Sequence, residues 1–390
     1  MSSERLIVKS PNGGRPLSET GPPLLAAFYL PQYHPIPENE EWWGAGFTEW
    51  SNVTKARPQF RGHYQPQVPS DLGYYDLRNP DVRRRQADLA AKAGVGAFAY
   101  YHYWFNGRRL LERPVEEIVR SESPEFPFFL VWANENWTRR WNGGTGKILI
   151  EQHYSPEDDL QHIRALRPAL TSSAYLRRDG KPMLAIYRSS KLPNPRATTD
   201  LWRREVEHWG LDGLYLLCIE SCGDAVSDPR ILGFDAAVEF PPSWADLPKK
   251  SAWSSSRRGL RWLHPRFSHH LLAYDDVAQH AMSMPDADYP RWPGVTPGFD
   301  NTARRRRGAV ILVDSTPGTY QGWLESALLR SDRVAKRFEA GLEGLVFVNA
   351  WNEWAEGNHL EPDQRHGHEF ILATQMAQSS VTRARDARHE

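Results

Sequence analysis

Residues 345–358 read LVFVNAWNEWAEGN, a short apolar run followed at once by polar and acidic side chains. No polar residue interrupts Leu345 to Val348, so the run fits a strand that is buried on both faces. In α/β proteins the carboxyl ends of parallel strands carry the functional side chains. We therefore interpret this stretch as the last strand of a parallel sheet together with the beginning of a site.

Seven other short apolar runs come before this stretch, and most are separated from the next run by a helical pattern. They occupy residues 24–30, 96–101, 128–133, 183–187, 214–219, 235–240 and 309–313. Eight continuous apolar strands that alternate with helices predict an α/β chain whose parallel strands close into a (β/α)8 barrel of the TIM type. No glycine-rich phosphate-binding motif follows the first run, which argues against dinucleotide-binding and P-loop folds.

Capping signals mark the helices between these strands. Asn79 with Pro80 and Ser155 with Asp158 are typical helix starts. Helices are expected at 79–93, from 155 onward, at 199–209 and at 321–340. Residues 241–307 are rich in Pro, Ser and Trp, and we expect them to form long loops, a large insertion over the carboxyl-terminal face.

The chain is expected to form one catalytic domain over residues 23–380. A flexible Gly- and Pro-rich leader at 1–22 precedes it, and a flexible tail at 381–390 follows it. The 390 residues carry a formal net charge of zero, so no nucleic acid or anionic membrane is predicted as a partner. The Arg304 to Arg307 run is the only basic block, and four residues are too few to change this expectation.

Localisation is predicted from the absence of familiar signals. The first residues contain no apolar segment typical of a secretory signal, and no apolar stretch approaches the ~20 residues needed to span a bilayer. The two cysteines, Cys218 and Cys222, do not form the spacing of a disulfide scaffold or a zinc site, and we expect free or buried thiols. A soluble cytoplasmic protein is the resulting prediction, with its oligomeric state left open.

Glu353 and Glu356 are the strongest candidates for catalysis. Two carboxylates three residues apart, directly after a buried strand, can point into the same pocket. Cleavage of a glycosidic bond needs one protonated and one ionised carboxyl group, and the neighbouring Trp351 and Trp354 would help to raise one pKa. The alternative, a solvated pair on a surface helix, fits this setting less well.

Other residues near the strand ends are predicted to contact the substrate. Glu135 is a third candidate carboxylate or a structural one, and Glu49 positions a hydroxyl or holds its loop. His102 is a donor to a sugar hydroxyl, a buried structural histidine, or neither. The 16 Trp, about three times average usage, suit the stacking of sugar rings, although many belong in the core. The predicted substrate-binding set is Tyr29, Tyr33, His34, Trp43, Glu49, Trp50, His102, Tyr103, Asn134, Glu135, Trp137, Asn352, Trp354 and Asn358.

Neither a metal nor a cofactor is predicted. His366 and His368 form a short pair without a third ligand nearby, and the chain has no HExxH or GxSxG motif.

Five stretches together resemble one known group of proteins. They are FYLPQYHPIPENEEWWGAGFTEWSNV, GAFAYYHYWF, LVWANENWTRRW, WPGVTPGFDNTARR and VNAWNEWAEGNHLEPD. Taken together, they are similar to the WbsX-type proteins, which are described as glycoside hydrolase family 99-like or as polysaccharide-biosynthesis glycosyltransferases. The similarity extends from about residue 26 to about residue 369.

The resemblance implies a mechanism for the two glutamates. Family 99 contains endo-acting α-mannosidases and mannanases with an E-W-x-E-G motif, which Glu353 to Gly357 matches here. In that family the first glutamate acts as a base toward the substrate's own 2-hydroxyl, which attacks the anomeric carbon. The second glutamate protonates the leaving oxygen and later activates water. By resemblance, Glu353 takes the first role and Glu356 the second. The stretches GFTEW and ANENW belong to the WbsX-type branch, so the substrate need not be mannose.

Three functional hypotheses follow. The leading one is a retaining glycoside hydrolase or transglycosylase acting on an α-linked oligosaccharide, polysaccharide or glycolipid. The second is a glycosyltransferase of cell-surface polysaccharide (lipopolysaccharide O-antigen) biosynthesis, for which Asp286-Ala287-Asp288 is a weak candidate for a metal-binding motif. The third is an inactive glycan-binding protein, which would be expected to lack one of the two glutamates.

Overall fold

The computed structural model describes residues 22–139, 147–221, 228–243 and 268–387. The leader predicted at 1–22 therefore lies almost entirely outside the described residues, as does Cys222. Cys218 is buried and free. At the other end, helix α10 (Glu369–Asp386) continues past residue 380, so the chain is helical where the flexible tail was predicted to begin.

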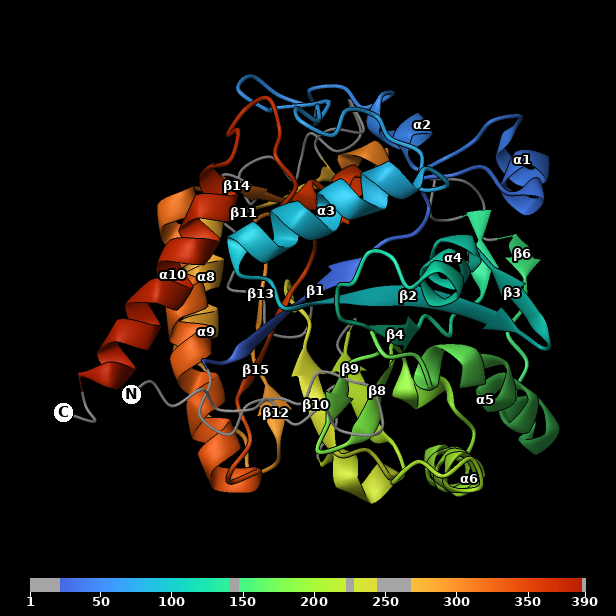
Figure 1. Ribbon diagram of the computed structural model, residues 1–390. Coiled ribbons are helices and arrows are strands. Elements are labelled where there is room, and N and C mark those ends of the chain that lie inside the picture. The colour runs from blue at the N-terminus through green and yellow to red at the C-terminus, as the bar shows by residue number, and fades with distance from the viewer. Residues whose placement is uncertain (1–21, 140–146, 222–227, 244–267, 388–390) are drawn as a thin grey trace, which may run out of the picture.

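A ring of parallel strands forms the centre of the molecule, and helices pack around it (Figure 1). Around the ring, the strands are β1 (Leu24–Tyr29), β2 (Ala97–Phe105), β4 (Phe128–Trp132), β8 (Lys181–Ile186), β9 (Tyr215–Glu220), β10 (Ala236–Glu239), β12 (Arg291–Trp292), β13 (Gly294–Val295) and β15 (Leu345–Val348). Strand β15 pairs with β1 in the register Leu24–Leu345, which brings the last strand beside the first. The predicted (β/α)8-type barrel is confirmed.

The seventh position in the barrel is occupied by a strand that the sequence analysis missed. We predicted residues 309–313, but β14 (Val310–Val313) pairs instead with β11 (His270–Ala273) in a separate two-stranded parallel sheet. Strands β12 and β13 close the barrel, because β12 pairs with β10 and β13 pairs with β15. Pro293 between them has no N–H to donate, so the apolar pattern is too short and too broken to be read as one strand.

The helices largely follow their capping signals. The Asn79 side chain accepts a hydrogen bond from Asp81 N at the start of α3 (Pro80–Ala93), which ends at Gly94 with a φ of 81°. The Ser155 side chain accepts from Asp158 N and starts α5 (Pro156–Leu170). Helix α6 (Pro195–Glu207) begins four residues before the predicted Thr199, because Asn194 is its N-cap and Pro195 its first residue.

The predicted insertion at 241–307 contains regular structure. Helix α8 (Tyr274–Ser283) follows β11 and packs against α9 (Pro317–Phe338), and residues 244–267 lie outside the described part of the chain. The remaining helices are α1 (Pro37–Trp43), α2 (Trp50–Val53) and α4 (Arg113–Ser121). Short strands β3 (Arg108–Leu110), β5 (Trp137–Thr138), β6 (Ile148–Ile150) and β7 (Arg177–Arg178) extend the loops. Figure 1 shows α1 and α2, which follow β1, together at one end of the barrel.

At Gly294 the backbone of β13 lies very close to residues 239–241, which leaves no room for a side chain. A Cβ at this position would lie 2.2 Å from the carbonyl oxygen of Glu239 and 2.7 Å from Cδ of Pro241. Because backbone cannot move away cheaply, we expect Gly294→Ala to destabilise the protein by roughly 3 kcal/mol in urea unfolding.

Gly322 supplies the matched control for this variant. It lies exposed within α9 and has open space around its missing Cβ, so Gly322→Ala should stabilise the protein by about 0.5–1 kcal/mol. Equal stabilities for Gly294→Ala and the wild type would contradict the close approach.

Candidate active site

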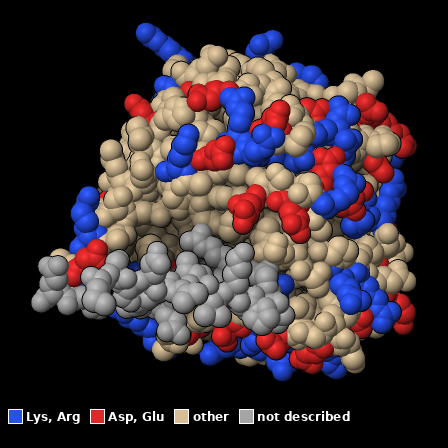
Figure 2. All heavy atoms as spheres, in the orientation of Figure 1, with Lys and Arg blue, Asp and Glu red and all other residues tan. Residues whose placement is uncertain are grey.

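A pocket opens at the carboxyl-terminal end of the barrel and combines acidic with aromatic side chains. Its charged lining in the described residues consists of Glu49, Glu135, Arg304, Glu353 and Glu356. Its aromatic lining consists of Trp43, Phe47, Tyr101, Tyr103, Trp137, Tyr187 and Phe240. On the face of the molecule in Figure 2, acidic and basic side chains are interspersed over the upper and right-hand parts rather than gathered by sign.

Glu353 and Glu356 enter this pocket from a tight turn after β15. Asn352 and Glu353 form strand β16 (Asn352–Glu353), which pairs with β17 (Asn358–His359). Between these strands runs the 3-10 turn η7 (Trp354–Glu356), capped by Gly357 with a φ of 55°. Glycine suits this left-handed conformation. The turn therefore brings two carboxylates three residues apart into the same pocket.

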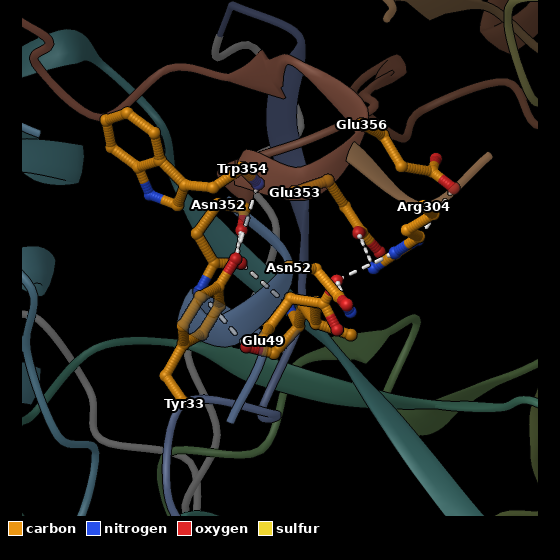
Figure 3. Close-up of polar contacts among 9 residues, drawn as sticks. Tyr33, Glu49, Asn52, Arg304, Asn352, Glu353, Trp354 and Glu356 are labelled. Atoms are coloured by element: carbon orange, nitrogen blue, oxygen red, sulfur yellow. Dashed lines mark hydrogen bonds and ion pairs between the residues drawn. The ribbon is translucent and has the colours of Figure 1, made fainter. Parts of the chain in front are cut away.

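Arg304 lies between three carboxylates (Figure 3). Its Nε donates to Glu49 at 2.8 Å, one Nη donates to Glu356 at 2.7 Å and the other Nη donates to Glu353 at 3.0 Å. The Arg304 side chain is 7% exposed, the Glu49 and Glu353 side chains are 3% and 8% exposed, and the Glu356 side chain is 21% exposed. One buried cation thus joins Glu49, from the loop after β1, to two acids of the turn after β15.

Burial controls the protonation of Glu353. The pKa of this carboxyl is raised from its usual 4.5 to about 8: loss of solvent raises it most, Arg304 lowers it, and the nearby Glu356 and Glu49 raise it. The three carboxylates hold the pKa of Arg304 well above its usual range despite its burial. The buried acid therefore keeps its proton to a higher pH than an exposed one, although a cation touches it.

The backbone of the turn is held by side chains behind the pocket. The Tyr33 hydroxyl donates to the carbonyl oxygen of Asn352 at 2.5 Å, and the Asn352 side chain bonds both backbone groups of Leu30, at 2.7 and 3.1 Å. The Trp354 indole donates to Glu361 at 2.6 Å and stacks on His359. These contacts join the turn to the end of β1.

Five predicted binding residues line the pocket, namely Trp43, Glu49, Tyr103, Glu135 and Trp137. Glu135 is paired with Arg188 at 2.9 Å, and Glu49 accepts a hydrogen bond from Arg304 at 2.8 Å. A further five lie behind the pocket wall and support it, namely Tyr33, Trp50, Asn352, Trp354 and Asn358. All five are buried, and none of them belongs to the described lining of the pocket.

The other four predicted binding residues do not line the pocket, which corrects the expectation for them. Tyr29 donates to Gln86 on α3, and His102 lies 3.0 Å from His162 on α5, where burial lowers the pKa of His102 to about 3. His34 is buried, which lowers its pKa to about 4. Asn134 bonds Tyr154 and the backbone of Arg188. Alternate residues of a strand face opposite sides, so closeness in sequence to a strand end did not ensure that a side chain faces the pocket.

Arg304 is the principal residue that the sequence analysis missed. We interpreted its basic run as insignificant, yet Arg304 is buried while Arg305, Arg306 and Arg307 are exposed. Tyr101, Tyr187 and Phe240 were also missed, although each lies at the end of a predicted strand. A search for aromatic as well as polar residues at the carboxyl ends of the predicted strands would have identified these three.

Comparison with known proteins places the chain in a family. The family model described as Glycosyltransferase WbsX matches residues 25–374. The chain belongs to the WbsX family. The uncharacterized protein WxcX of Xanthomonas campestris pv. campestris strain ATCC 33913, and the same protein from strain B100, are each 44% identical to it over 374 residues. These matches cover 96% of this chain and 52% of each relative, so the chain spans about half the length of those proteins.

Two solved structures resemble this WbsX chain along most of its length. The GH99 endo-alpha-mannosidase from Bacteroides thetaiotaomicron in complex with BIS-TRIS-propane is 15% identical, with a TM-score of 0.55 over 95% of this chain and 99% of that chain. A glycoside hydrolase-like protein is 13% identical, with a TM-score of 0.57 over 92% and 95%. The WbsX chain therefore has the barrel fold of the GH99 endo-alpha-mannosidase, as the sequence resemblance implied.

The candidate metal motif of the WbsX chain is engaged in ion pairs elsewhere. Asp286 pairs with Arg333 at 3.0 Å and Asp288 pairs with Arg337 at 3.0 Å, both on helix α9. Across the described ranges, no group of three or more His, Cys, Asp and Glu side chains is placed to hold a metal ion. None of the helices in the described part of the chain combines the length and apolar character needed to span a bilayer.

The raised pKa of Glu353 predicts a stability that depends on pH. Below pH 4.5 this acid is protonated in the folded and the unfolded chain alike. Between pH 4.5 and about 8 the unfolded chain releases the proton first, so stability falls as pH rises. Glu353→Gln removes this loss, and its free energy of unfolding relative to the wild type should rise by roughly 3 kcal/mol between pH 5 and 8.

Urea unfolding at several pH values measures this change. Glu41→Gln makes the same chemical change at an exposed position and serves as the control. A difference between Glu353→Gln and the wild type that stays constant from pH 5 to 8 would argue against a proton held by Glu353.

Proposed function

We propose that this chain is a retaining glycoside hydrolase or transglycosylase that acts on an α-linked, mannose-containing or related glycan. One observation carries the proposal. Glu353 and Glu356 reach a single aromatic-lined pocket from one turn at the carboxyl-terminal end of a barrel, and Arg304 binds both. A pair of carboxyl groups in one pocket supplies the acid and the base that glycoside cleavage requires.

The proposed first step uses Glu353 as the base and Glu356 as the acid. Glu353 takes the proton of the substrate's 2-hydroxyl, whose oxygen forms a bond to the anomeric carbon. The bond from that carbon to the leaving oxygen breaks, and Glu356 gives its proton to the leaving oxygen. In the second step Glu356 takes a proton from water, and the water oxygen bonds to the anomeric carbon as its bond to O2 breaks. Glu353 returns its proton to O2, and the two inversions give net retention. An acceptor hydroxyl in place of water gives transglycosylation.

The environment of Glu353 supports its role as the base. A carboxylate whose pKa is raised to about 8 binds a proton more tightly than an ordinary one, which favours removal of a proton from a weakly acidic hydroxyl. The price is a smaller ionised fraction, about one tenth at pH 7. On activated aryl glycosides, which need no proton from Glu356, we therefore expect kcat/KM to rise through about pH 8, whereas an acid at this position would make it fall.

The family description favours a second candidate, a glycosyltransferase of polysaccharide biosynthesis. A nucleotide-sugar donor would bring a diphosphate, which needs a metal ion or free cations. Arg304 is the one cation in the described lining of the pocket, and three carboxylates already engage it. This lining favours an uncharged glycan over a diphosphate.

A side-by-side assay separates the two candidates. One arm offers α-linked oligosaccharides and activated glycosides, and the other offers nucleotide sugars with acceptors and a divalent metal. Sugar release that EDTA leaves unchanged supports the hydrolase. Release of nucleoside diphosphate that depends on acceptor and metal overturns it.

Substitution of each glutamate tests the assigned roles. Glu356→Gln should lower kcat/KM by roughly 10²–10⁴-fold on glycosides with poor leaving groups and spare activated aryl glycosides, which need no protonation. Glu353→Gln should lower activity on both kinds of substrate, and the exposed Glu41→Gln should lower neither. Full activity in both pocket variants would remove these residues from the mechanism.

The substrate's own 2-hydroxyl can be tested directly. A 2-deoxy analogue of an accepted glycoside lacks the proposed nucleophile, so the wild-type enzyme should bind it without turning it over. Normal turnover of the 2-deoxy analogue, measured as release of the same leaving group, would rule out participation of this hydroxyl.

A further inference from the structure

The three acids around Arg304 outnumber the one cation. If all of them ionised, this buried site would carry two uncompensated negative charges, which is costly away from water. The Tyr33, Tyr101 and Tyr103 side chains also face these acids, and burial raises each of their pKa values, so they add no charge near neutral pH. The number of protons held by the acids therefore depends directly on the guanidinium.

The position of Arg304 is fixed independently of the acids. It directly follows the 3-10 turn η6 (Asn301–Ala303), whose start is capped by the Asp300 side chain through Thr302 N at 2.9 Å. His63 and Gln65 contact the same carboxylate at 2.7 and 2.6 Å.

Asp300 also holds the turn that carries Glu356. Its backbone N–H donates to the carbonyl oxygen of Glu356, and a Cβ on Gly357 would lie 3.1 Å from the Asp300 Cβ. One residue thus fixes both Arg304 and the backbone of Glu356 before any substrate binds.

We propose that Arg304 is a positioning residue of the reaction: by bridging Glu49, Glu353 and Glu356 it keeps Glu353 available as a carboxylate and holds the two reacting acids at a fixed separation. The inference rests on the proposed function, since it assigns the base to Glu353. Glu49 then acts through Arg304, which its carboxylate binds at 2.8 Å with support from Asn52 at 3.2 Å.

On an activated aryl glycoside, removal of the cation and removal of a neighbouring acid should move the rise of kcat/KM with pH in opposite directions. Arg304→Met removes the cation, so Glu353 keeps its proton to higher pH and the rise of kcat/KM moves up by at least about one unit, a loss of at least about tenfold at pH 7. Arg304→Lys keeps a charge and should recover part of the loss. Glu49→Gln removes a neighbouring negative charge and should move the rise to lower pH.

Arg305→Met is the matched control, because Arg305 follows Arg304 in the chain and is exposed. Its profile should superimpose on that of the wild type. A merely structural role for Arg304 would lower activity at every pH and leave the profile in place. If kcat/KM rises at the same pH in Arg304→Met, Glu49→Gln and the wild type, the proposal is wrong.

A second measurement needs no substrate and so separates this inference from the proposed function. The melting temperature of Arg304→Met should fall further below that of the wild type as pH rises from 5 to 8. Without the cation the folded chain holds its acidic protons to a higher pH, whereas the unfolded chain releases them at the usual pH. Adding Glu353→Gln to Arg304→Met should recover part of the difference at pH 8. If Arg304→Met does not fold, Arg304→Lys and Glu49→Gln replace it. Their melting-temperature differences from the wild type should change with pH in opposite directions.

Sugar release and the pH dependence of the melting temperature test the two proposals separately. Absence of sugar release from every substrate, with the pH-dependent melting difference present, contradicts the proposed function and leaves the charge role of Arg304 standing. A melting difference that does not change with pH, or that Arg305→Met reproduces, contradicts the charge role itself.

Discussion

Strand β15 is hydrogen-bonded on both of its edges, to β1 on one side and to β13 on the other. These pairings place its carboxyl end in the interior of the molecule, where the next residues can reach the pocket without leaving the core. The backbone N–H of Trp351 continues this connection by donating to the carbonyl oxygen of Phe28, and Asn352 does so by bonding Leu30. The turn that carries both glutamates is therefore held in place by the same strand pairing that closes the barrel.

Barrel closure also determines the electrostatics of the pocket. Once Glu353 is carried into a buried position, its ionisation becomes costly, and a cation nearby reduces that cost. Arg304 supplies the cation from a segment that returns over the barrel after β13, and Glu49 comes from the loop after β1. Glu49, Arg304 and the turn that carries Glu353 and Glu356 come from distant parts of the sequence, and only closure of the barrel brings them together.

The insertion between β10 and β14 shows how one segment can serve the barrel and the site. Its residues 291–295 complete the ring of strands, and its residues 300–304 hold Arg304 in place. An apolar run was a misleading guide here. The longer run at 309–313 looks more like a barrel strand than RWPGV does, but β14 pairs with β11 beside the barrel. Hydrophobicity indicates that a strand is buried and does not specify its partner.

The sequence by itself determined the barrel and the two motif glutamates. Continuous apolar strands need cover on both faces, helix caps such as Asn79 and Ser155 act locally, and Glu353 and Glu356 follow directly on a strand. Only the tertiary structure decided which strand closes the ring, that Tyr29 and His102 face the helices, and that Arg304 joins three acids. These outcomes depend on strand register and on contacts between residues as far apart as Glu49 and Arg304, and no local pattern of residues encodes either.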